Sequence, residues 1–201
     1  MKKVIISLVS SLLVALLGIV GLNLFKDKGP RERVKADNGS RIIVEELSFY
    51  RHNDKIFGKV FKPADEKGFF PDSLGPRPVI VFFHEPLKTA FPEGLVGYST
   101  AFHENARDIS FMVKKIGKEK FADSERIILI ADSFSSEAVV KASYKLGKAV
   151  SGLVLIEPEL GEKESRLVPK LGYEVLTIDT AGKTSARTTI LDYLETRGAL
   201  K

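Results

Sequence analysis

Ser133 is the side chain in this sequence best placed for nucleophilic chemistry. It follows a run of branched apolar residues, 127–130, that is typical of a strand buried on both faces, and it precedes a helical pattern over 137–146. Small residues stand two positions before and two positions after it, as a tight strand-to-helix turn requires. A helix that begins there directs free N–H groups, among them that of Phe134, toward an anion forming at Ser133. The alternative is an ordinary turn in which the Ser133 hydroxyl caps the helix.

A serine nucleophile needs a general base, and histidine is the usual one. The sequence contains His52, His84 and His103, all of which precede Ser133. His84 follows the apolar strand pattern 78–83, and strands of this class present ligand-binding groups at their carboxyl ends. His84 is therefore the first candidate base and His103 the second. For His103, on the polar face of a helix, and for His52, in a turn, the alternative is a solvated surface residue.

An acid is needed to orient such a base, and two carboxylates follow strand patterns. Asp179 comes after the pattern over 173–178, and Glu157 comes after the pattern over 151–156. Both could instead cap helices or lie in loops.

Strand patterns and amphipathic helix patterns account for the rest of the chain. Strands are predicted over 41–49, 55–62, 78–83, 126–131, 151–156 and 173–178, and helices over 102–116, 137–146 and 186–194. The first two strands flank a turn and form a hairpin, and residues 87–100 are predicted to be a loop. The pattern predicts an α/β fold: a mostly parallel sheet flanked by helices, with an N-terminal hairpin.

Several of these segments resemble the α/β-hydrolase family. Residues 131–135, Ala-Asp-Ser-Phe-Ser, resemble the nucleophile elbow G-x-S-x-G, with both glycines replaced by small residues. The hairpin carries Ile56, Gly58 and Pro63 in the pattern I-x-G-x-x-x-x-P, and residues 78–84 read P-V-I-V-x-x-H. These segments occur in the order in which the family has them.

The resemblance implies a serine hydrolase that cleaves a carboxylic ester or amide by acyl transfer, without a cofactor, on a small-molecule or peptide substrate. It implies Ser133 as the nucleophile and Asp179, by its general location, as the acid. In the family the position of His84 is structural or supports the oxyanion loop, so His84 is the catalytic candidate only as a replacement for the family's base. It also implies an oxyanion site formed by the Phe134 N–H and by the loop that begins at His84 and Glu85. Glu85 stands where the family has glycine, and a carboxylate is unfavourable beside a developing anion.

Three interpretations remain open at this point. In the family the base is a histidine near the carboxyl terminus, whereas here none follows Ser133. The chain is therefore either an active hydrolase with another base, or a catalytically inactive hydrolase-like module for binding or structure. The third possibility is a truncated or rearranged chain. Residues 172–182 (G-Y-x-V-x-x-x-D-x-x-G) resemble a family strand expected before the elbow, which indicates either a rearranged sheet or a likeness generic to strands.

The composition suits a single domain. The chain has 201 residues, 44% of them hydrophobic, three histidines, no cysteine and a net charge of +5. Its lysines alternate with acidic residues instead of clustering, so no nucleic-acid partner is predicted. The histidines and acidic residues show no metal-ligand spacing, and no metal or cofactor is predicted.

The amino terminus predicts contact with a membrane. Residues 4–25 carry no charge and are long enough to cross a bilayer as a helix. We interpret residues 1–25 as a signal anchor or signal peptide, 26–40 as a polar linker and 41–201 as the α/β-hydrolase-like domain. The protein is therefore expected to be membrane-anchored or exported. Lysine and arginine flank the segment on both sides, which leaves its orientation open.

Overall fold

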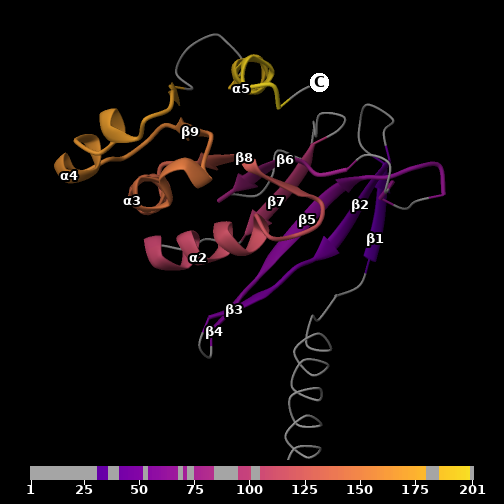
Figure 1. The fold of residues 1–201 in the computed structure, drawn as a ribbon. Helices are drawn as coiled ribbons and strands as arrows, with labels where there is room; N and C mark the ends of the chain where they lie inside the picture. Colours follow the sequence, from indigo (N-terminus) through magenta and orange to yellow (C-terminus); the bar gives the residue numbers. More distant parts are fainter. Residues whose placement is uncertain are drawn as a thin grey trace, which may run out of the picture.

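The computed structural model describes most of the chain beyond residue 30 (Figure 1). The described residues are 31–35, 41–51, 54–67, 70–71, 75–83, 95–100, 105–179 and 186–199. The predicted membrane segment over 1–25 lies outside them, and so do His52, His84, Glu85 and His103. No helix within the described residues is long and apolar enough to cross a membrane.

A central sheet organises the described part of the chain (Figure 1). Its strand order is β1-β2-β5-β7-β6-β8-β9-β10. The strands are β1 (Arg31–Lys35), β2 (Arg41–Glu46), β5 (Gly58–Pro63), β6 (Arg77–Phe82), β7 (Val96–Thr100), β8 (Ala122–Ala131), β9 (Gly152–Ile156) and β10 (Val175–Ile178). Strands β7, β6, β8, β9 and β10 are parallel, whereas β1, β2 and β5 pair antiparallel. The predicted mostly parallel sheet is confirmed.

The predicted N-terminal hairpin is also present, with β2 and β5 as its arms. Beyond these arms its tip continues as a second ladder, β3 (Phe49–Arg51) paired with β4 (Asp54–Ile56). Strand β1 falls within residues that we expected to be linker. It pairs with β2 at the edge of the sheet, where charged sequences such as RERVK are common because they discourage further pairing.

Strand β7 corrects the expectation of a loop over residues 87–100. It lies between β5 and β6, with Val96 and Tyr98 fully buried. Its sequence, VGYST, is short and contains glycine and serine in place of a branched apolar run, so its pattern resembled a loop. Residues 175–178 form β10, which pairs with β9 at the edge of the sheet, and this place favours a generic likeness of residues 172–182 to strands over a rearranged sheet.

Helices cover both faces of the sheet. On one face lie α2 (Ala106–Ile116) and α3 (Ser136–Leu146), and on the other lies α5 (Ala186–Thr196) (Figure 1). Shorter turns are η2 (Gly147–Ala149), α4 (Glu162–Ser165) and η3 (Val168–Lys170). Alternate residues of β8 face opposite sides of the sheet. Ile127 and Leu129 pack with α2 and α3, and Ile128 and Ile130 pack with α5. This double burial explains why the strand is apolar throughout.

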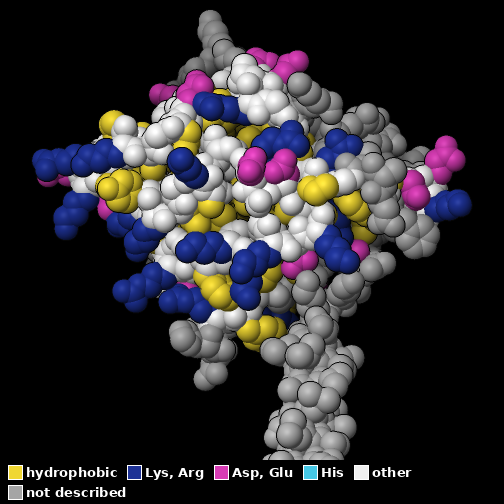
Figure 2. Space-filling model, in the orientation of Figure 1, with side chains coloured by type: hydrophobic (Ala, Val, Ile, Leu, Met, Phe, Trp, Pro, Cys, Tyr) yellow, Lys and Arg dark blue, Asp and Glu magenta, His cyan; other side chains and the backbone are white. Residues whose placement is uncertain are grey.

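Helix α2 begins four residues later than the predicted 102. Asn105 caps it by accepting a hydrogen bond from the Arg107 N–H at 2.9 Å. Its outer side is basic and exposed at Lys114 and Lys115. Figure 2 shows lysine and arginine side chains spread over the visible face, with acidic side chains among and around them.

A close approach fixes the hairpin to the sheet. Gly58 lies against the ring of Tyr98, and a Cβ at residue 58 would overlap that ring. The Tyr98 hydroxyl donates to the Leu47 carbonyl at 3.2 Å, and burial raises the pKa of this phenol. The glycine of the I-x-G pattern is therefore required by packing.

Candidate active site

The turn between β8 and α3 holds Ser133 beyond the end of the central strand. Asp132 and Ser135 close this turn reciprocally. The Asp132 Oδ1 accepts from the Ser135 N–H at 2.9 Å and from its hydroxyl at 2.7 Å, and the Ser135 Oγ accepts from the Asp132 N–H at 3.1 Å. This arrangement satisfies N–H groups at the start of the helix, as a capping box does. The N-cap residue of α3 is Ser135, so the Ser133 hydroxyl does not cap the helix.

The backbone at Ser133 lacks the strain of a nucleophile elbow. Among the described residues, Glu157 is the one non-glycine residue with a positive φ, at 47°. Ser133 is therefore outside the left-handed region, and hydrogen bonds between Asp132 and Ser135 hold its turn without left-handed strain. Ser133 is half-buried, and its hydroxyl forms no hydrogen bond with another described residue. The next side chain, Phe134, is 80% exposed.

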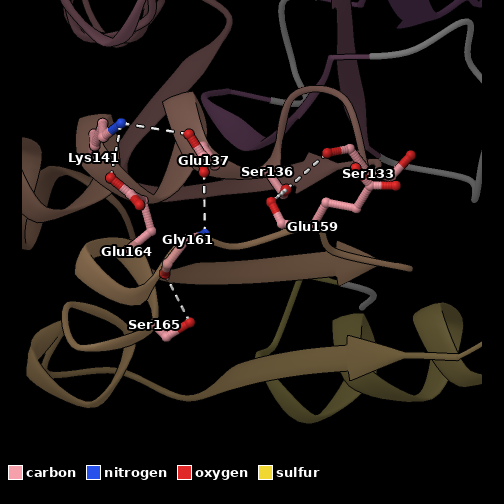
Figure 3. A network of polar contacts seen from close by, with 8 residues as sticks. All are labelled: Ser133, Ser136, Glu137, Lys141, Glu159, Gly161, Glu164 and Ser165. Atoms are coloured by element: carbon pink, nitrogen blue, oxygen red, sulfur yellow. Dashed lines mark hydrogen bonds and ion pairs between the residues drawn. The ribbon is translucent and has the colours of Figure 1, made fainter.

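Ser136 joins this turn to the segment that follows β9. It is fully buried, and its Oγ lies 2.9 Å from the Ser133 carbonyl oxygen and 3.0 Å from that of Glu159 (Figure 3). The two carbonyls share the single hydroxyl proton. The β9–α4 loop, residues 157–161, is thereby tied to the backbone of Ser133.

Further along the helix, α3 holds the same loop by charged groups. Glu137 Oε1 accepts from the Gly161 N–H at 3.0 Å, and Lys141 Nζ lies 2.8 Å from Glu164 Oε1 and 3.6 Å from Glu137 Oε2 (Figure 3). The hydrogen bond from Lys141 lowers the pKa of Glu164, a buried residue, and the same bond raises the pKa of Lys141. Opposite charges at this distance explain both directions.

The carboxylates at the ends of the next two strands are exposed. Glu157 follows β9, and its N–H donates to the Ile178 carbonyl at 2.8 Å. Asp179 follows β10, which is separated from β8 by β9. Two strand spacings put roughly 10 Å between β8 and β10. Asp179 thus lies at the carboxyl end of its strand, as predicted, but two strands away from the strand that precedes Ser133.

The predicted site residues divide into two groups. Ser133, Phe134 and Asp179 are described and follow strands at one edge of the sheet. The candidate base His84 and the oxyanion-loop residue Glu85 lie outside the described residues, so their predicted roles stay predictions. The described residues contain no group of three or more acidic or histidine side chains able to hold a metal ion.

Sequence reasoning missed the residues that shape the turn. The pair Asp132 and Ser135 has the three-residue spacing of a capping box, and that spacing was a usable signal. The link from Ser136 to Glu159 joins segments 23 residues apart and has no sequence signal. Glu137 and Lys141 show the i,i+4 spacing of a helical ion pair, but nothing in the spacing indicates that they hold a loop.

Comparison with solved structures identifies the fold. The chain superposes on a cold-adapted esterase from an Arctic intertidal metagenomic library with a TM-score of 0.56 and 12% identity, covering 84% of this chain and 97% of that chain. It superposes on a protein assigned as a carboxylesterase from Lactobacillus plantarum with a TM-score of 0.57 and 10% identity, covering 80% of this chain and 100% of that chain. No family model and no curated protein matches the sequence. The chain has the α/β-hydrolase fold.

Proposed function

We propose that the protein is a serine hydrolase that cleaves a carboxylic ester by acyl transfer at Ser133. The location of Ser133 carries this proposal: it is half-buried beyond the central strand, and its hydroxyl has no hydrogen bond to another described residue. Within the described residues this hydroxyl has no structural hydrogen bond, and the residue keeps part of its surface exposed. The two structural neighbours are named as esterases, which favours an ester as the acyl donor.

The reaction would follow the usual two half-reactions of a serine esterase. The Ser133 Oγ attacks the ester carbonyl carbon while its proton passes to the base, and the carbonyl electron pair forms an oxyanion. Collapse of this intermediate expels the alcohol, which takes the proton from the base, and leaves an acyl-serine. Water then repeats the attack, and the carboxylic acid and free serine are released. The Phe134 N–H, which has no hydrogen-bond partner among the described residues, would donate to the oxyanion.

His84 is the proposed base in this scheme. Strand β6 is the neighbour of β8, and the Phe83 N–H donates to the Ile130 carbonyl at 3.1 Å. The chain therefore continues into His84 from a point beside the end of β8. Asp179 is the proposed orienting acid, and Glu157, one strand nearer to β8, is the alternative.

A second candidate function is binding without catalysis. The unstrained backbone at Ser133 favours it, because a nucleophile elbow normally holds its serine in a strained turn. The Asp132 carboxylate favours it too, since it occupies the N–H of Ser135 and adds negative charge near any oxyanion.

Hydrolysis of p-nitrophenyl acetate and butyrate by the full chain tests the proposal. We expect turnover that Ser133→Ala abolishes and that Ser124→Ala, at an exposed serine near the start of β8, leaves unchanged. His84→Gln should lower kcat by about 10²-fold or more, as loss of a general base does. Turnover that survives Ser133→Ala would contradict the assignment of the nucleophile. No turnover by a parent chain that melts cooperatively would favour the binding module.

A further inference from the structure

The Ser136 hydroxyl contacts the peptide group that contains the proposed oxyanion donor. Its acceptor at 2.9 Å is the carbonyl oxygen of Ser133, and that carbonyl shares one peptide unit with the Phe134 N–H. A peptide unit is planar, and in the trans form its C=O and N–H point in opposite directions. Fixing the carbonyl therefore fixes the direction of the N–H.

We propose that Ser136 is a positioning residue for the reaction at Ser133. Its hydroxyl holds the peptide plane between Ser133 and Phe134 so that the Phe134 N–H faces the carbonyl oxygen under attack. A hydrogen bond to the carbonyl also polarises the amide and strengthens the N–H as a donor. This inference rests on the proposed function, because the N–H matters for catalysis only if an oxyanion forms there.

The Ser136 hydroxyl has a second contact outside its own turn and helix, and this contact supports the positioning role. A serine near the start of a helix often bonds the carbonyl three residues before it, and that contact alone is common. Here the same Oγ also lies 3.0 Å from the Glu159 carbonyl oxygen, so the hydroxyl is held from two sides in a fully buried site. The β9–α4 loop thus supports the orientation of the peptide plane.

The loop is itself held closely, which makes it a firm support. The Gly161 N–H donates to Glu137 Oε1, and a Cβ at residue 161 would lie 2.7 Å from Glu164 Oε2 and 3.0 Å from Glu137 Oε1. Lys141 fixes both carboxylates by its contacts (Figure 3). The loop that carries the Glu159 carbonyl is therefore attached to α3 at a second place, through Gly161.

Kinetics of three variants separate positioning from general loss of packing. Removing a whole oxyanion donor costs about 10²–10³ in kcat, so a misaligned donor should cost less. We expect Ser136→Ala to lower kcat by about 10-fold with KM within about two-fold, and Ser136→Thr, which keeps the hydroxyl, to recover most of the loss. Ser143→Ala removes a buried serine hydroxyl two turns along the same helix and should leave kcat within about two-fold. Equal effects of Ser136→Ala and Ser143→Ala would overturn the inference.

A second readout does not depend on activity. The ¹⁵N order parameter of the Phe134 amide should fall from about 0.85 toward 0.6 in Ser136→Ala and stay high in Ser143→Ala and Ser136→Thr. If the parent shows no turnover, the proposed function fails, and the order parameter alone decides whether Ser136 holds the peptide plane. An unchanged order parameter at Phe134 in Ser136→Ala would overturn that claim.

Discussion

At the scale of single residues, the Ser133 turn is shaped by hydrogen bonds in which the Ser133 side chain takes no part. Asp132 and Ser135 close the turn, and the Ser136 hydroxyl donates to the Ser133 carbonyl. The Ser133 hydroxyl is left without a structural bond to the described residues. A reactive side chain requires such a turn, because neighbouring groups hold the backbone while the reactive hydroxyl stays unbonded.

The pair of Lys141 and Glu164 should make stability depend on pH. The folded-state pKa of Glu164 lies below its ordinary 4.5, so its contribution is present above pH 4.5 and is lost as pH falls through the folded value. The folded-state pKa of Lys141 lies above its ordinary 10.5, so its contribution is lost only as pH rises beyond that value. We expect Glu164→Gln to lower the Tm at pH 7 and the difference from the parent to shrink below pH 4.5.

Glu162→Gln provides the control for that measurement. Glu162 pairs with Arg166 on the surface, where an ion pair contributes little because water and salt screen it. Its Tm should follow the parent at every pH. A deficit of Glu164→Gln that stays constant between pH 3 and pH 7 would show that the ion pair is not its cause.

At the scale of elements, the sequence predicts those strands and helices whose patterns are strong. The branched apolar runs of β6, β8 and β9 and the 3.6-residue spacing of α2 each correspond to an observed element. Strand β7 was not predicted because its sequence has no apolar run. It is buried because it lies between β5 and β6 in the sheet. At the site, the position of Ser133 was predictable from a strand followed by a helix. Its backbone conformation was not, because it depends on the hydrogen bonds between Asp132 and Ser135.

The contact of Gly58 with Tyr98 joins the hairpin to β7 and offers a test of this element. Gly58→Ala should lower the free energy of unfolding by about 1–3 kcal/mol, because the new methyl group overlaps the buried ring. Chemical denaturation measures the change. If the overlap is the cause, Gly58→Ala should cost less in a Tyr98→Leu background than in the parent. Equal costs in the two backgrounds would contradict this explanation.

At the scale of the whole molecule, the register relates the amino terminus to the hairpin. Arg31 pairs opposite Glu45 in β2, so β1 begins at the end of the sheet from which the tip of β3 and β4 extends. The predicted membrane segment over residues 4–25 precedes that point. If this segment anchors the protein, the hairpin tip lies on the side of the domain from which the anchor departs.

Membrane anchoring has a direct measurement. The full chain expressed in bacteria should remain in the membrane pellet after extraction with alkaline carbonate. Substitution of Leu13 and Leu16 in the middle of the segment by aspartate should move it to the supernatant, since a charge is costly in the bilayer core. Substitution of the exposed Tyr144 by aspartate should leave it in the pellet. Recovery of the unaltered chain in the supernatant, at full mass, would contradict the anchor.

Covalent labelling by a fluorophosphonate tests the central claim most directly, because the probe reacts with an activated serine by displacing fluoride at phosphorus. Peptide mapping by mass spectrometry then locates the adduct. The account predicts one phosphonylated residue, Ser133, with labelling lost in Ser133→Ala and kept in Ser124→Ala. An adduct at another serine, or no adduct on the folded parent chain, would contradict it.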